Sequence, residues 1–160
     1  MLYLPLSGGC RLGLCGEAVL RDGKLSGLRH ISSAAVRFAS ARPGIAQNAA
    51  DRLLERGYPE PALIVGPPGS GKTTFLRDLI RCVSLRGFRV CVADQRRELS
   101  AAVEGVPQLE LGPCTDVLTG CPKGQAMELL VQTMNPQVLA VDELSAGETE
   151  AALEGASCGA

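Results

Sequence analysis

The stretch at positions 66–74 reads Gly66-Pro67-Pro68-Gly69-Ser70-Gly71-Lys72-Thr73-Thr74. It fits the phosphate-binding pattern G-x-x-x-x-G-K-[ST] at every required position. The apolar run from Ala62 to Val65 comes directly before it and is typical of a buried parallel strand. Apolar residues then recur at helical spacing from Phe75 to Val83. The sequence therefore predicts a strand, a glycine-rich loop and a helix in direct succession.

Each part of this loop has an expected contact with a bound nucleotide. Its glycines let backbone N–H groups approach phosphate oxygens, and the helix N-terminus adds a partial positive charge. Lys72 is expected to reach the β- and γ-phosphates, and the Thr73 hydroxyl is expected to ligate Mg²⁺. All nine residues from Gly66 to Thr74 are therefore predicted to bind nucleotide, with ATP and Mg²⁺ as cofactors. The alternative is an ordinary Gly-Pro turn.

Two further apolar runs end in acidic residues. The run from Val138 to Val141 is followed by Asp142 and Glu143, which have the chemistry of a Walker-B element. Asp142 is expected to hold Mg²⁺ through water, and Glu143 to orient and deprotonate the attacking water. The run from Phe88 to Ala93 ends at Asp94, where open α/β sheets place ligand-contacting residues. Asp94 is thus a third catalytic candidate beside Lys72 and Glu143.

Asp94 opens a charged stretch, Asp94-Gln95-Arg96-Arg97-Glu98, that has two interpretations. It is either a second polar element facing the nucleotide or a charged loop in solvent. Three arginines on the helix after residue 74 raise a similar question, because they lie opposite its apolar face. Arg77, Arg81 and Arg86 either form a solvated face or contact phosphate or a neighbouring subunit. The sequence leaves both questions open.

The residues before position 44 predict antiparallel β-structure. Asp22-Gly23 supplies a hairpin turn within residues 21–24, and a further strand is expected from Ala35 to Ala39. Gly13 and Gly16 suggest a bulge or a close backbone approach in the first strand. A break at residues 41–44 separates two expected domains. Residues 1–43 are a β-hairpin part of an N-terminal domain, and residues 44–160 are a P-loop ATPase domain, truncated after the Walker-B helix.

The second domain is predicted to be α/β, with a parallel sheet and helices on both faces. Helices are expected from Ile45 to Arg56, from Gln125 to Met134 and from Glu148 to Glu154. Residues 104–119 contain several Gly and Pro residues and are predicted to form a loop.

Composition narrows the classes of function. The chain has 160 residues, a net charge of −1, three Phe and two Tyr, which argues against a nucleic-acid partner. Seven cysteines lack any C-x-x-C pair and accompany a single histidine, so a zinc site is not expected. The odd cysteine count fits a reducing cytosol. No run of 18 apolar residues and no basic leader are present, so neither a membrane span nor a secretory signal is predicted.

The motifs, taken in order, resemble the stage III sporulation protein AA family. The resemblance covers nearly the whole chain and combines a glycine-rich hairpin, an extended phosphate loop with its helix, and three later motifs. The corresponding stretches are residues 6–19, 66–81, 115–118, 121–123 and 134–144. The family usually has Glu at the position of Gln95 and Ser at that of Arg97.

The resemblance implies a fold, a function and a setting. The family is similar to RecA-like ATPases of type II and type IV secretion, which are ring-shaped and usually hexameric motors. It acts in the mother cell of endospore-forming bacteria and serves a membrane channel complex. The implied location is cytoplasmic, with a peripheral position at the membrane left open. Family members are about twice as long, so the chain is interpreted as an internal fragment that is expected to be inactive alone.

Other functions stay open at this point. The main hypothesis is an ATP-hydrolysing motor subunit of a sporulation channel. A nucleotide-binding remnant without turnover, a P-loop ATPase that binds single-stranded nucleic acid and a small-molecule kinase are the alternatives. The implied sheet order makes residues 88–93 and 138–141 neighbours, while a missing strand separates residues 138–141 from 62–65. In simpler phosphate-loop folds these last two segments pair directly.

Overall fold

The computed structural model describes residues 3–5, 10–37 and 41–144. The chain divides into two compact units, Met1–Ser40 and Ala41–Ala160, each of which is described by itself. The expected boundary was three residues further along the chain. The predicted helix from Glu148 to Glu154 and the end of the expected strand at Phe38 and Ala39 lie outside the described residues.

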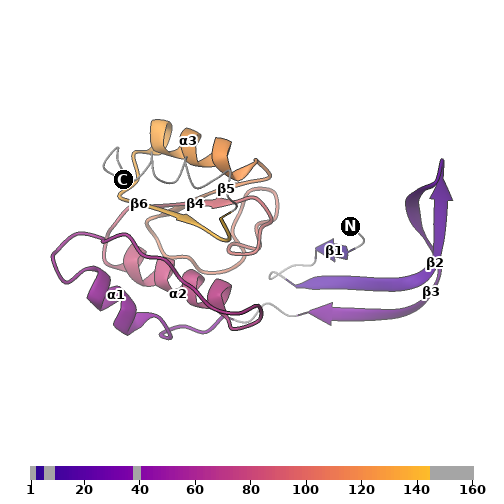
Figure 1. Cartoon of the computed structure of the whole chain (residues 1–160), viewed down its shortest axis with the longest axis horizontal. Coiled ribbons are helices and arrows are strands. Elements are labelled where there is room, and N and C mark those ends of the chain that lie inside the picture. The colour runs from indigo at the N-terminus through magenta and orange to yellow at the C-terminus, as the bar shows by residue number, and fades with distance from the viewer. Residues whose placement is uncertain (1–2, 6–9, 38–40, 145–160) are drawn as a thin grey trace. The chain divides into compact units, whose positions relative to one another are not determined.

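The N-terminal unit is an antiparallel sheet of strands β1 (Tyr3–Pro5), β2 (Arg11–Arg21) and β3 (Lys24–Arg37), in the order β1-β2-β3 (Figure 1). The predicted turn is confirmed, with positive φ angles of 52° at Asp22 and 72° at Gly23. The bulge is confirmed at Gly16, where the β2–β3 register shifts between residues 15 and 17. A Cβ at Gly16 would lie 2.7 Å from the carbonyl oxygen of Arg29, so only glycine fits.

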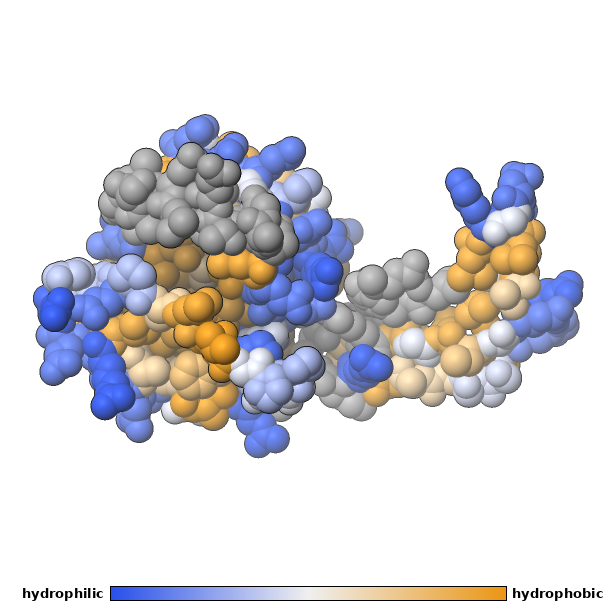
Figure 2. All heavy atoms as spheres, viewed as in Figure 1, coloured by the Kyte–Doolittle hydropathy of each residue, from blue (hydrophilic) through white to orange (hydrophobic). Residues whose placement is uncertain are grey.

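Two details of this unit differ from the sequence prediction. β3 runs without interruption from Lys24 to Arg37, so its second half is not a separate strand. β1 was not predicted, because three residues are too few to carry an alternation that can be recognised. Apolar side chains of β2 and β3, such as Leu20 and Ile31, are exposed, and Figure 2 shows them along the hairpin.

The C-terminal unit is built on a parallel sheet in the order β5-β4-β6. Its strands are β4 (Val90–Asp94), β5 (Thr115–Thr119) and β6 (Val138–Val141). The central strand β4 is buried along its whole length, as expected for a parallel strand covered on both faces. Its pairing with β6 confirms the predicted neighbours. The predicted loop at 104–119 was wrong for β5, whose polar sequence Thr-Asp-Val-Leu-Thr becomes a strand through parallel pairing with β4.

Helices cover both faces of this sheet (Figure 1). α1 (Gln47–Leu53) and α2 (Lys72–Leu85) lie on one face, and α3 (Lys123–Met134) lies on the other. The first hydrophobic core packs α1 and α2 against Val90 and Val92 of β4. The second core packs Ala126, Met127 and Leu130 of α3 on Cys91 and Ala93. The predicted α/β layers are confirmed, and helices lie where residues 45–56, 75–83 and 125–134 predicted them. α1 is shorter than expected, while α2 and α3 begin earlier.

The predicted strand from Ala62 to Val65 is wrong. No pairing joins this segment to any strand of the described part of the chain. Leu63 and Val65 are 79% and 82% exposed, while the half-buried Ile64 packs on the first core. An apolar run needs partners for its backbone N–H and C=O groups to become a strand. Here both edges of β4 are taken by β5 and β6.

Candidate functional site

The loop from Gly66 to Gly71 closes on the side chain of Lys72. Lys72 Nζ donates hydrogen bonds to the carbonyl oxygens of Gly66 at 2.8 Å and Pro67 at 2.9 Å. Gly69 and Gly71 have φ angles of 76° and 91°, which residues with a side chain rarely adopt. A Cβ at Gly66 would lie 2.9 Å from Ser70 Oγ, so a larger residue there would require the Ser70 side chain to move. The sequence pattern thus corresponds to a compact loop leading directly into α2.

The first turn of α2 meets the end of β6. Thr73 Oγ1 donates a hydrogen bond to Asp142 Oδ2 at 3.0 Å, although the two residues are 69 positions apart. The hydroxyl and the carboxylate are hard oxygen donors of the kind that Mg²⁺ prefers. Among the described residues no cluster of three or more His, Cys, Asp or Glu could hold a metal. Mg²⁺ does not need one, since it is usually bound by one or two carboxylates, substrate phosphates and waters. Thr73 and Asp142 therefore fit the predicted ion.

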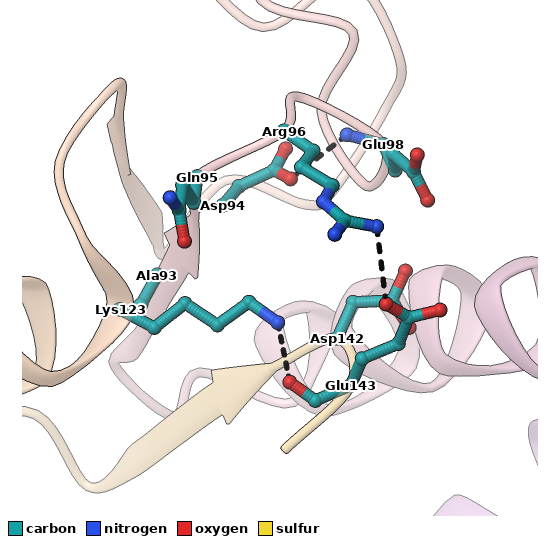
Figure 3. A pocket seen from close by; sticks show the side chains of 8 residues that line it. All are labelled: Ala93, Asp94, Gln95, Arg96, Glu98, Lys123, Asp142 and Glu143. Carbon is teal, nitrogen blue, oxygen red and sulfur yellow. Dashed lines mark hydrogen bonds and ion pairs between the residues drawn. The ribbon is translucent and has the colours of Figure 1, made fainter. Parts of the chain in front are cut away.

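A small pocket lies at the carboxyl end of the sheet, beside this pair of residues (Figure 3). The strand ends of β4 and β6, the loop after β4 and the start of α3 contribute its lining. The lining residues are Ala93, Asp94, Gln95, Arg96, Glu98, Lys123, Asp142 and Glu143. Four of these eight side chains are acidic and two are basic, so the pocket is polar and its charges are partly balanced.

Asp94 holds the loop that follows β4. Its Oδ1 accepts from the backbone N–H of Glu98 at 2.8 Å, and its Oδ2 accepts from both the N–H and the hydroxyl of Ser100 at 2.8 and 2.6 Å. Only 3% of Asp94 is exposed. Because both oxygens are engaged in the loop, this geometry favours a structural role over the predicted catalytic one. The loop itself lines the pocket through Gln95, Arg96 and Glu98. This position fits the interpretation of residues 94–98 as a polar element at the site better than that of a loop in solvent.

Arg77 ties the same loop to α2. It is buried, and its guanidinium donates to the carbonyl oxygens of Leu99 at 2.8 Å and Glu98 at 2.7 Å. Burial lowers the pKa of Arg77, while the negative charges of Asp94 and Asp142 act in the opposite direction. The phosphate-loop helix and the loop after β4 are thereby joined through one side chain.

The interpretation of the three arginines as a solvated face is wrong. Besides Arg77, Arg81 pairs with the buried Asp78 at 2.8 Å, and Arg86 pairs with Asp51 of α1. The three side chains have different partners: Arg77 contacts the loop after β4, Arg81 contacts Asp78 within α2, and Arg86, which caps α2, contacts α1.

Glu143 is the exposed acid of the pocket. Its Oε2 lies 3.3 Å from Arg96 Nη1, and its main-chain oxygen accepts a hydrogen bond from Lys123 Nζ (Figure 3). Its φ angle is 57°, in the left-handed region. The sequence interpretation did not assign Arg96 or Lys123 to the site individually. The sequence feature that could have identified Lys123 is its place at the start of a helix, where the helix dipole disfavours a cation.

Asp142 sits in an electrostatically unfavourable place. Burial raises its pKa, the hydrogen bond from Thr73 lowers it, and the charges of Glu98 and Glu143 raise it again. Lys123 opposes these carboxylates and lowers the pKa of Asp142. Because burial and neighbouring carboxylates disfavour the ionised form of Asp142, a nearby cation would stabilise that form. This is the property expected of a metal ligand.

The family model described as "Sporulation stage III, protein AA" matches residues 2–160. The chain belongs to the stage III sporulation protein AA family. "Stage III sporulation protein AA" of Bacillus subtilis (strain 168) is 36% identical over 163 residues, which cover 98% of this chain and 53% of that protein. The chain thus spans about half the length of this family member. No solved structure matches the chain.

Membership in the stage III sporulation protein AA family connects the chain with sporulation. It also bears out the resemblance noted in the hairpin and phosphate-loop motifs. In the part of the chain that the structure describes, no helix combines the length and the apolar character needed to cross a membrane.

Proposed function

We propose that the unit formed by residues 41–160 has a P-loop NTPase fold, binds Mg-ATP at residues 66–74 and hydrolyses it. The hydrogen bond between Thr73 and Asp142 carries this proposal. It joins the helix after the glycine-rich loop to the acid that follows β6. Chemistry on a triphosphate needs these two parts close together, because both hold the Mg²⁺ that neutralises the phosphates. A Gly-Pro turn of purely structural importance would not explain why a half-buried carboxylate meets the hydroxyl that follows the lysine.

The side chains divide the work of the proposed reaction. Lys72 would exchange its bonds to the loop carbonyls for bonds to phosphate oxygens, since an ammonium forms stronger bonds with ionised acceptors. Thr73 and Asp142 would hold Mg²⁺, which when bound neutralises charge on the phosphates. Glu143, exposed at the pocket, would accept a proton from the attacking water. Asp94 is not given a chemical step, because its oxygens bind the loop.

The proposed setting follows from the family and not from the site. Membership in a sporulation family supports a role in the mother cell, and a secretion-type ATPase would act as a motor there. We propose that the full-length protein forms a homo-oligomeric, hexameric ring at the cytoplasmic side of a membrane channel complex.

A second candidate is a nucleotide-binding protein without turnover. The observation that favours it is the unpaired segment from Ala62 to Val65, which leaves the phosphate loop without a strand on one side. Binding and turnover therefore need separate tests.

Nucleotide binding is tested by Lys72→Ala. We expect the variant to lose at least about 100-fold in affinity for a fluorescent ATP analogue, because a charge-assisted contact to the triphosphate disappears. Lys24→Ala, at the exposed hairpin turn, is the matched control and should bind like the unaltered protein. Equal affinity in the Lys72 and Lys24 variants would remove the basis of the nucleotide assignment.

Turnover is tested by Glu143→Gln in the full-length protein. ATP should still bind, while phosphate release slows by about 10²–10⁴-fold, the usual contribution of a general base. Glu128→Gln, at an exposed position of α3, is the control and should hydrolyse ATP normally. If the unaltered protein binds ATP and releases no phosphate, the second candidate is correct. Normal turnover by the Glu143 variant would exclude Glu143 as the base.

A further inference from the structure

Lys123 is a buried cation whose place in its own helix has no local benefit. It is the first residue of α3, 9% exposed, and the first turn of this helix contains no acidic residue. A cation there opposes the positive end of the helix dipole. Residues that violate a local rule in this way are often found at functional sites.

The backbone brings Lys123 to the pocket. β5 ends at Thr119, opposite Asp94 in the parallel register, and Gly120 with a φ of 73° turns the chain into α3. Parallel strands end at one edge of a sheet, so the start of α3 lies beside the ends of β4 and β6. Figure 3 shows the Lys123 side chain extending from α3 across the pocket to Glu143.

The contact that Lys123 makes there is with the main chain of Glu143. Its Nζ donates to the Glu143 carbonyl oxygen, and no salt bridge to a carboxylate is seen among the residues that the structure describes. Glu143 has a left-handed φ of 57°, which a non-glycine residue keeps only when its surroundings hold it. Arg96 contacts the carboxylate of Glu143 from the other side of the pocket at 3.3 Å.

We propose that Lys123 is a positioning residue that fixes the backbone of Glu143 so that its carboxylate faces the attacking water. This inference rests on the proposed ATPase function. Lys123 touches neither the phosphate loop nor the Thr73–Asp142 pair through a hydrogen bond in the described part of the chain. Its removal is therefore expected to affect turnover and to spare nucleotide binding.

The test compares Lys123→Met and Lys123→Arg in the full-length protein. A general base contributes about 10²–10⁴-fold, so partial misplacement of Glu143 should lower kcat of the Met variant by about 10- to 100-fold. The affinity for the fluorescent ATP analogue should change less than about threefold. The Arg variant should recover most of kcat, because arginine keeps a donor of similar reach.

Two controls separate positioning from simple destabilisation. Arg81→Met removes a buried ion pair with Asp78 on the far part of α2 and should lower the melting temperature while kcat stays near normal. The double variant Lys123→Met with Glu143→Gln should be no slower than Glu143→Gln alone, since residues that act as a unit have non-additive effects. Lys123→Gln, which is shorter and polar, replaces the Met variant if that variant does not fold.

The outcomes are distinct. Normal kcat in the folded Met or Gln variant overturns the inference and leaves the ATPase proposal intact. Loss of nucleotide affinity also overturns it, because Lys123 would then act on binding and not on turnover alone. Additive losses in the double variant contradict a shared role with Glu143. If the unaltered full-length protein releases no phosphate, the proposed turnover fails and this inference fails with it.

Discussion

Two apolar runs of the C-terminal unit have similar sequences and different structures. Val90–Asp94 forms the central strand β4, and every residue of it is buried. Ala62 to Val65 is equally apolar, yet it pairs with no described strand, and Val65 is 82% exposed. Composition makes both runs suitable for a parallel sheet. The difference is that β4 has β5 and β6 as hydrogen-bond partners, which shows that an apolar run becomes a strand only where such partners exist.

The loops that follow the two runs differ in the same way. The loop after β4 is held by the buried carboxylate of Asp94 and by Arg77. The loop after Val65 is held by the side chain of Lys72, which bonds to the loop's own carbonyl oxygens. Its connection to the sheet is indirect, through the hydrogen bond from Thr73 at the start of α2 to Asp142 after β6. Under the proposed function, a nucleotide would replace the contacts that Lys72 makes within its own loop, so that loop could change shape on binding. The loop after β4 is held by side chains of β4 and α2, and none of these contacts involves the glycine-rich loop.

The largest expected difference is between Val92→Asp and Val65→Asp. Val92 is fully buried, and an unpaired buried charge costs several kcal/mol, which is comparable with a typical total stability of about 5–15 kcal/mol. The Val92 variant should therefore be unfolded at 25 °C by circular dichroism. The Val65 variant should melt like the unaltered protein, because exposed substitutions usually change stability by less than about 0.5 kcal/mol. Equal damage at both positions would mean that residues 62–65 are paired in the folded protein.

A smaller loss is expected when the loop after β4 loses its anchor. Asp94→Ala leaves the N–H groups of Glu98 and Ser100 and the Ser100 hydroxyl without their acceptor. Unsatisfied buried groups cost about 1–3 kcal/mol each, so leaving three donors without an acceptor should reduce stability in urea unfolding by at least about 3 kcal/mol. Asp116→Ala, at an exposed acid of β5, is the control and should be nearly neutral. A stable Asp94 variant with lost turnover would restore Asp94 as a catalytic residue.

The smallest effect concerns the link between β6 and the phosphate loop. Burial raises the folded-state pKa of Asp142 above its ordinary value of 3.8, so ionised Asp142 destabilises the fold at pH 7. Asp142→Asn keeps an acceptor for Thr73 and removes the charge. It should melt at a higher temperature than the unaltered protein at pH 7, because the cost of the ionised carboxylate is removed.

The sign of this pH effect can be checked directly. Well below pH 3.8 Asp142 is protonated in both the folded and the unfolded state, so the advantage of the Asn variant should disappear as the pH falls through this range. Asp142→Ala removes charge and acceptor together and should be less stable than the Asn variant at every pH. An Asn variant that melts below the unaltered protein at pH 7 would contradict the proposed cost of the carboxylate.

Much of this fold could be predicted because local patterns carry it. The helix after residue 71, the helix near 125–134, the strand from Val138 to Val141 and the turn at Asp22-Gly23 all appear where spacing and turn chemistry predict them. β5 was missed because Thr115–Thr119 is polar and becomes a strand only by pairing with β4. For the site, the motifs identified Lys72, Thr73 and Asp142 as candidates. They did not distinguish the anchoring role of Asp94 from a chemical one.

By itself the sequence determined the glycine-rich loop, the helical faces and the acids at the strand ends, because these depend on residues within a few positions of one another. The tertiary structure alone decided which apolar runs pair, that Arg77 is buried against Leu99, 22 positions away, and that Lys123 reaches Glu143, 20 positions away. The physical reason is that backbone pairing and the burial of a charge depend on partners from distant elements. A single stretch of sequence does not contain those partners.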